Sequence, residues 1–231
     1  MKSIKAICCS ALAAGMLLTG CSSMTNTGKG ALIGGGGGGA LGAGVGALIG
    51  GGKGAAIGSA IGAAVGAGAG ALIGKKMDKQ AAQLKEQLAN ADVETVQDDR
   101  GLQAIKVTFP GGILFPTNGT TLSANAQTEL AEFANSLKQN PNTNVQIYGY
   151  TDNTGSMAAN TKVANGRAAA VDSFLANSGI APTRLQAQGI PMANYVASND
   201  TAAGRAQNRR VEIYITADQN MINAANNGTL Q

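Results

Sequence analysis

The sequence predicts an α/β sandwich, with helices on one face of a mixed sheet, preceded by a helical glycine-zipper segment in a membrane. Two observations carry this prediction. After Val93, strand-like and helix-like patterns alternate in the order β-α-β-α-β-β. Before it, glycine recurs at every fourth position from Gly30 to Gly74. The chain of 231 residues has room for one such domain, assigned to residues 103–217, plus N-terminal segments.

Composition excludes several classes of function. The chain has no histidine, so it has no His-based triad, general base or metal site. The formal charge of +4 falls to about +2 once Lys2 and Lys5 leave with a leader peptide, and no clustered basic patch with aromatic residues stands out. We therefore expect no enzyme, no metal, no cofactor and no nucleic-acid partner.

Residues 1–20 have the form of a secretory signal, with two lysines followed by an apolar run from Ala6 to Leu18. The run ends in LTGCS, which resembles a bacterial lipobox, so Cys21 is the predicted lipidation site and the first residue of the mature chain. The other two cysteines, Cys8 and Cys9, would leave with the leader, and the remaining one has no disulfide partner. The alternative is an ordinary signal peptide that contains a cysteine.

A short polar linker, residues 21–27, leads into two 24-residue repeats, 28–51 and 52–75, which match at 16 positions. On a helix, glycines four residues apart share one face and allow a second helix to approach closely. The uncharged stretches before and after Lys53 contain 23 and 21 residues, and a membrane span needs roughly 20. We expect two packed crossings with a turn near Gly51 to Lys53. The alternative is a flexible Gly/Ala linker outside the membrane.

Residues 76–102 are predicted to form a helical linker and a hairpin. The stretch 77–92 has the pattern of a short polar helix, which we interpret as a solvated spacer without a binding role. Two strand-like runs, Val93 to Val96 and Leu102 to Phe109, flank Asp98-Asp99-Arg100-Gly101 and predict the hairpin.

The elements of the domain follow in order. A helical stripe runs from Leu122 to Leu137 and ends at Asn140-Pro141, and a strand follows at Val145 to Tyr150. A second helix contains Val163 to Leu175, with Gly179 expected in the C′ position that ends it. Two further strands are expected, at Arg184 to Gln188 and at Val211 to Thr216. Residues 218–231 are expected to form a C-terminal tail.

Several separated motifs occur in this domain. Residues 149–155 read GYTDNTG and follow Tyr148. Asn160 lies eight residues after Asp152, and Arg167-Ala168 lie fifteen and sixteen residues after Asp152. Residues 208–212 read NRRVE. These blocks resemble the signature of OmpA-like domains over roughly residues 103–217. With the lipobox and the glycine zipper, the layout resembles the YiaD-type lipoproteins.

The resemblance implies non-catalytic binding of the peptidoglycan stem peptide at its diamino acid, usually diaminopimelate. Such a ligand carries an ammonium and a carboxylate on one carbon. Asp152 would accept from the ammonium, and Arg167 would hold the carboxylate through two parallel N–H bonds. Thr151 and Asn160 are expected to shape the rim of this site.

Arg209 and Arg210 would point to opposite faces of a strand, so at most one reaches the site, and we assign Arg210 to it. Two positions depart from the usual family pattern. Ala164 lacks a hydroxyl, and Gly166 loosens the helix beside Arg167. Both could change how tightly the site binds and which stem peptide it prefers.

The main hypothesis is a lipoprotein that tethers a membrane to the cell wall. Ser22 and Ser23 lack the aspartate that retains lipoproteins in the inner membrane of enteric bacteria, which favours the outer membrane with the domain in the periplasm. Its partners would be the stem peptide and membrane lipid, with a homo-oligomer left open. The alternative is a membrane-active or oligomeric glycine-zipper protein, with wall binding secondary. A wall hydrolase is disfavoured because no nucleophile, metal cluster or pair of acids stands out.

Overall fold

The computed structural model describes residues 65, 67–116 and 118–230. These residues form a five-stranded sheet whose strands lie in the spatial order β1-β2-β5-β3-β4. The strands are β1 (Asp92–Gln97), β2 (Gln103–Pro110), β3 (Thr143–Tyr150), β4 (Leu185–Ile190) and β5 (Arg210–Ala217). β3 and β4 pair in parallel, and the other neighbours pair antiparallel, so the sheet is mixed.

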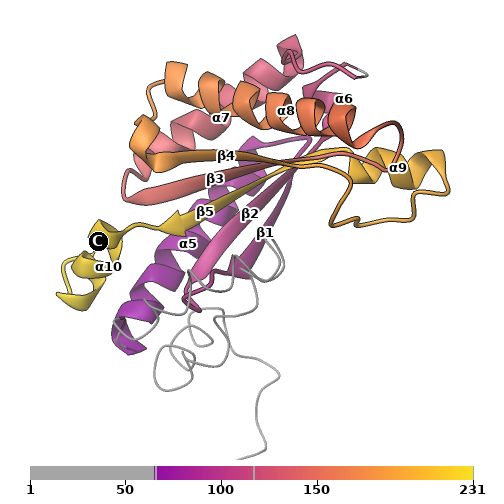
Figure 1. Cartoon of the computed structure of the whole chain (residues 1–231). Helices are drawn as coiled ribbons and strands as arrows, with labels where there is room; N and C mark the ends of the chain where they lie inside the picture. The colour runs from indigo at the N-terminus through magenta and orange to yellow at the C-terminus, as the bar shows by residue number, and fades with distance from the viewer. Residues whose placement is uncertain (1–64, 66, 117, 231) are drawn as a thin grey trace, which may run out of the picture.

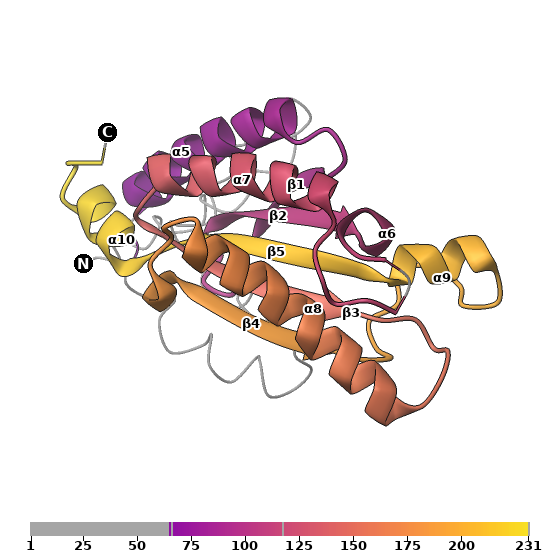
Figure 2. The ribbon, with the colours of Figure 1, turned by 90° about the horizontal axis from the view of Figure 1, so that it is seen from above.

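Three long helices form a layer over one face of this sheet (Figures 1 and 2). They are α5 (Ala67–Gln87), α7 (Ala124–Gln139) and α8 (Met157–Asn177). The shorter elements are α6 (Gly111–Leu114), η2 (Pro182–Arg184), α9 (Ala202–Asn208) and α10 (Gln219–Asn226). The predicted fold class is confirmed, and β1 with β2 forms the predicted hairpin.

Local chemistry explains where α7 and α8 begin and end. The hydroxyls of Ser123 and Ser156 accept from the backbone N–H groups three residues on, and so cap the two helices. Gly179 ends α8 with φ of +92°, while Ile180 N donates to Leu175 O. This is a Schellman ending, and it places Gly179 in the predicted C′ position.

The first helix, α5, is not the solvated spacer that the sequence predicts. Ile73, Met77 and Leu84 are fully buried in the hydrophobic core, and the helix packs on β1 and β2. Their spacing of four and seven residues places them on one face. The domain therefore begins near Ala69, well before the predicted boundary at residue 103.

This packing also changes the prediction for the second glycine repeat. Because α5 begins at Ala67, the uncharged stretch after Lys53 keeps 13 residues, 54–66, outside the domain helix. Roughly 20 are needed for a membrane span. Within the described residues, no helix is long and apolar enough to cross a membrane. The rest of both predicted crossings, the signal peptide and Cys21 lie outside the described residues.

The predicted tail is partly a helix. Met221, Ile222 and Ala225 of α10 are buried, and α10 packs against α5. The carboxylate of Asp218 caps this helix by accepting from Met221 N. The C-terminal segment therefore belongs to the fold.

Candidate functional site

The candidate site lies at the carboxyl end of β3. The loop 151–156 leads from this strand into α8, and α6 and the junction of α9 with β5 lie at the same end of the sheet (Figure 1). Segments distant in sequence thus bring Asp152, Arg167 and Arg209 into one group of charges: Arg209 lowers the pKa of both neighbours, and Asp152 raises the pKa of Arg167 against the effect of burial.

Asp152 is buried, and both of its carboxylate oxygens are held. Oδ1 accepts from the backbone N–H and the hydroxyl of Thr154, and Oδ2 accepts from Nη1 of Arg209 at 2.6 Å. Burial by itself would raise the pKa of Asp152, but the Thr154 hydrogen bonds and Arg209 together lower it below the usual 3.8. The site therefore contains a fixed carboxylate anion at neutral pH.

Arg167 projects from α8 and is also buried. Its Nε donates to Gly119 O at 3.1 Å, and its guanidinium lies over the Phe115 ring, 5.2 Å from the centroid. Among the described residues, Gly119 O is the acceptor that the Arg167 side chain has. Asp152 forms its ion pair with Arg209 and not with Arg167. Burial and the Arg209 charge lower the pKa of Arg167, which stays cationic. Its terminal N–H groups are available to an acceptor.

The structure corrects the choice between the two neighbouring arginines. Arg209, and not Arg210, contacts Asp152. Arg210 is buried, forms an ion pair with Glu212 at 2.7 Å, and stacks on Tyr150 at 3.9 Å from the ring centroid. Alternation along a strand could not identify the arginine that contacts Asp152, because Arg209 is the C-cap of α9 and precedes β5.

Asn160 and Thr151 hold the loops around the site. The Asn160 side-chain amide donates to the carbonyl oxygens of Thr154 and Ser156, which fixes the loop before α8. The Thr151 hydroxyl accepts from Met192 N and so joins the end of β3 to the segment after β4. Both side chains are buried, so their positions agree with a shaping role.

Two glycines let α8 lie directly on the sheet. Gly149 and Gly189 are register partners on β3 and β4. A Cβ at Gly149 would be 2.4 Å from Ala164 O, and one at Gly189 would be 2.4 Å from Asn165 N. Ala164 is fully buried at this contact. The close approach sets the height of α8, and with it the position of Arg167.

Gly166 also allows a close approach to α8, which the sequence did not predict. A Cβ at this position would lie 2.8 Å from the methyl group of Thr120. The missing side chain lets the segment 118–120 lie against α8, where Gly119 O receives the Arg167 hydrogen bond. Gly111 acts similarly, because its N–H donates to Arg209 O at 2.7 Å and a Cβ there would lie 2.4 Å from the same oxygen.

The arrangement suits a zwitterionic ligand. It offers one buried carboxylate, one buried guanidinium whose terminal N–H groups have no acceptor among the described residues, and a second guanidinium, Arg209, whose side chain is 39% exposed. No group of three or more metal-ligating side chains occurs in the part of the chain that the structure describes. The charged side chains of the site form ion pairs, hydrogen bonds and a cation–π contact.

Fold and site together define a class of binding domain. Residues 114–209 match the OmpA family, and residues 1–78 match the YMGG-like Gly-zipper family. The α/β domain is therefore an OmpA-family domain, and the Gly-zipper match covers the chain before it and the first part of α5. OmpA-family proteins that bind peptidoglycan are non-catalytic, so the domain is a binding module and not an enzyme.

Two relatives show which proteins of this class the chain resembles. The chain is 36% identical to the probable lipoprotein YiaD of Escherichia coli (strain K12) over 140 residues, 61% of this chain and 63% of that protein. It is 39% identical over 112 residues to the peptidoglycan-binding protein ArfA of Mycobacterium tuberculosis, 48% of this chain and 34% of that one. The chain thus spans less than two thirds of either relative.

Solved structures agree on the fold. The cell wall anchor of the T6SS from Pseudomonas aeruginosa aligns with a TM-score of 0.51 and 30% identity, over 62% of this chain and 97% of that chain. A MotB-like protein from Desulfovibrio vulgaris aligns with a TM-score of 0.54 and 23% identity, over 64% and 94%. The second likeness concerns the fold alone.

Proposed function

We propose that the domain binds the peptidoglycan stem peptide at its diaminopimelate-type residue, without chemical change to the wall. The observation that carries this proposal is the pairing of a buried anion, Asp152, with a buried guanidinium, Arg167, whose terminal N–H groups are free of described acceptors. The side-chain end of diaminopimelate presents the complementary pair, an ammonium and a carboxylate on one carbon.

In this proposal the ligand replaces an internal contact. The ammonium takes a position at Asp152 Oδ2, where Arg209 now donates. Arg209 is the exposed member of that pair, so it can turn toward the ligand carboxylate beside Arg167. Two guanidiniums would then face one carboxylate, and Asp152 would face the ammonium. Asn160 and Thr151 keep the surrounding loops in place.

We infer that the whole protein is an envelope lipoprotein that tethers a membrane to the wall. Cys21 would carry the lipid, the Gly-zipper would lie in or at the membrane, and the domain would lie in the periplasm. The lipobox, the Gly-zipper match and the likeness to a probable lipoprotein support this. The absence of aspartate at Ser22 and Ser23 favours the outer membrane.

Sedimentation tests the wall-binding proposal. Full-length protein in a neutral detergent is mixed with purified sacculi, and a free diaminopimelate-containing tripeptide is added as competitor. We expect co-sedimentation that the tripeptide abolishes and that Arg167→Lys weakens, because lysine keeps the charge but loses the two parallel N–H donors. Arg205→Lys on α9 is the matched control and should bind like the parent. If the Arg167→Lys variant binds sacculi as tightly as the parent, the assignment of Arg167 to the site is wrong.

A second candidate function follows from the Gly-zipper. We propose it as membrane activity or self-association of residues 22–66, motivated by the period-four glycines. Dye leakage from liposomes on adding this segment, or its cross-linking into oligomers, would support it. An intact vesicle population and a monomeric segment would count against it.

A further inference from the structure

A pocket of about 420 Å³ lies at the opposite end of the domain from Asp152. It is formed where the start of α5, the end of α7 and the C-terminal segment meet. Its lining residues are Leu72, Lys75, Lys76, Lys79, Gln80, Gln83, Gln139, Asn140 and Leu230. Asn140 precedes β3 and Asp152 follows it, so roughly 25 Å of strand separates the two sites.

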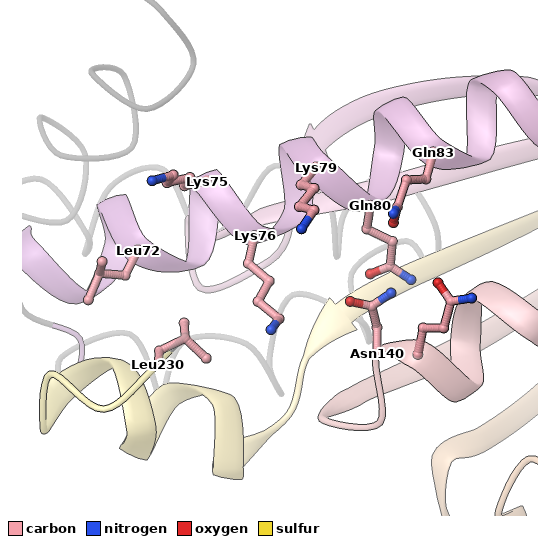
Figure 3. A pocket seen from close by; sticks show the side chains of 9 residues that line it. Leu72, Lys75, Lys76, Lys79, Gln80, Gln83, Asn140 and Leu230 are labelled. Carbon is pink, nitrogen blue, oxygen red and sulfur yellow. The ribbon is translucent and has the colours of Figure 1, made fainter.

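The pocket is cationic. Its lining includes three lysines and no acidic residue. Among the described residues, Lys75 and Lys79 form no ion pair, and both are exposed. Figure 3 shows Lys76 and Lys79 extending from α5 toward α10 and Asn140. An anion entering this space would meet positive charge from one helix face.

The inner wall of the pocket contains a buried hydrogen-bond acceptor without a donor. Gln80 is 1% exposed, and its Oε1 has no hydrogen-bond partner, while its amide nitrogen makes a long contact of 3.4 Å with Ser136 Oγ. A buried carbonyl oxygen without a donor costs free energy. A ligand that carries a hydroxyl group close to its negative charge would satisfy both this oxygen and the lysines.

The outer end of the pocket is apolar and lies at the start of α5. Leu72, which is 38% exposed, and Leu230 face each other there (Figure 3). The Gly-zipper match runs to residue 78 and so includes the first part of α5, which places this end of the pocket nearest the lipid surface in a membrane-anchored chain.

We propose that this pocket binds the headgroup of an anionic phospholipid whose phosphate is followed by hydroxyl donors, as in phosphatidylglycerol. The phosphate lies among Lys75, Lys76 and Lys79, a glycerol hydroxyl donates to Gln80 Oε1, and the acyl end leaves past Leu72 and Leu230. The site fixes the orientation of the domain on its membrane. It is independent of wall binding at the other end of the sheet.

Native mass spectrometry of the full-length protein in a neutral detergent tests this. The probes are phosphatidylglycerol, phosphatidylcholine, which lacks a donor, and the free headgroup glycerophosphoglycerol. We expect one tightly bound phosphatidylglycerol. Lys79→Gln should weaken it about fivefold, the effect of one lysine at a lipid surface, while Lys85→Gln, six residues further along α5, leaves it unchanged.

Gln80→Met separates binding from folding. Methionine fills the space without the unpaired oxygen, so Tm should hold or rise, while the preference for phosphatidylglycerol over phosphatidylcholine falls to the part that the lysines supply. Equal effects of the Lys79 and Lys85 variants, no preference between the lipids in the parent, or binding of the free headgroup as tight as the lipid would each overturn the proposal. Sacculus binding should stay at the parent level in both pocket variants, so this test stands apart from that of wall binding.

Discussion

Replacement of Asp152 by asparagine isolates the charge of the candidate site from its structural role. Asparagine keeps a carbonyl oxygen, so it can still accept from Thr154 N and hold the turn. It loses the ion pair with Arg209, in which the Asp152 side chain is 6% exposed and the Arg209 side chain 39% exposed; because the arginine left behind can be solvated, we expect a cost of about 1 kcal/mol. The free energy of unfolding should therefore change little.

Binding should respond much more strongly. A hydrogen bond to a charged group contributes about 1.5–3 kcal/mol, which corresponds to roughly tenfold to a hundredfold in affinity. Arg167 and Arg209 would also remain as two cations without the anion, and both repel the ligand ammonium. The assay is calorimetric titration of the full-length protein with a soluble diaminopimelate-containing muropeptide, beside chemical denaturation of the same samples.

Asp172→Asn supplies the matched control, since it makes the same change on α8 near the far end of the helix. The control should bind like the parent. If Asp152→Asn binds within twofold of the parent, or if the control loses affinity equally, the assignment of the ammonium to Asp152 is wrong.

Three further outcomes are expected. Arg210→Ala leaves the buried Glu212 carboxylate without its partner, so denaturation should show a loss of about 3–5 kcal/mol, while the folded fraction still binds sacculi. Gly189→Ala places a methyl group 2.4 Å from Asn165 N and should cost about 1–3 kcal/mol by the same measurement. The lowered pKa of Asp152 keeps its carboxylate charged above 3.8, so sacculus binding should persist as pH falls to that value and decline only below it; a midpoint well above pH 3.8 would contradict this.

Local patterns predicted the sheet-forming half of the fold well. The hairpin, the helix that ends before Pro141 and the Gly179 ending each depend on residues close in sequence, and the structure confirms them. Asp152 and Arg167 could be selected because an ordered set of motifs surrounds them. Their roles as ligand residues stay predictions, but the structure does place both side chains, buried, in one site.

The predictions were wrong where the place of a residue in the fold depends on tertiary contacts. The change in composition at Lys75-Lys76 indicated a boundary, although the apolar stripe of α5 continues through it from Ile73 to Leu84. Small, evenly spaced residues fit a membrane helix and a helix packed on a sheet equally well. In the NRRVE motif, the choice of arginine depends on where α9 ends and β5 begins, a matter of one residue.

The position of α5 bears directly on how a tether of this kind would carry load. If the chain before residue 67 is held at a membrane and the loop after β3 holds the wall, tension enters at the start of α5 and leaves near Asp152. Between these points it passes through Ile73, Met77 and Leu84, which pack into the core shared with β1 and β2, and then across the hydrogen-bonded sheet to β3. A solvated spacer would have let the domain swing freely. A helix that is part of the core fixes the direction of the binding site relative to the anchor, so its apolar face contributes to the proposed function as well as to stability.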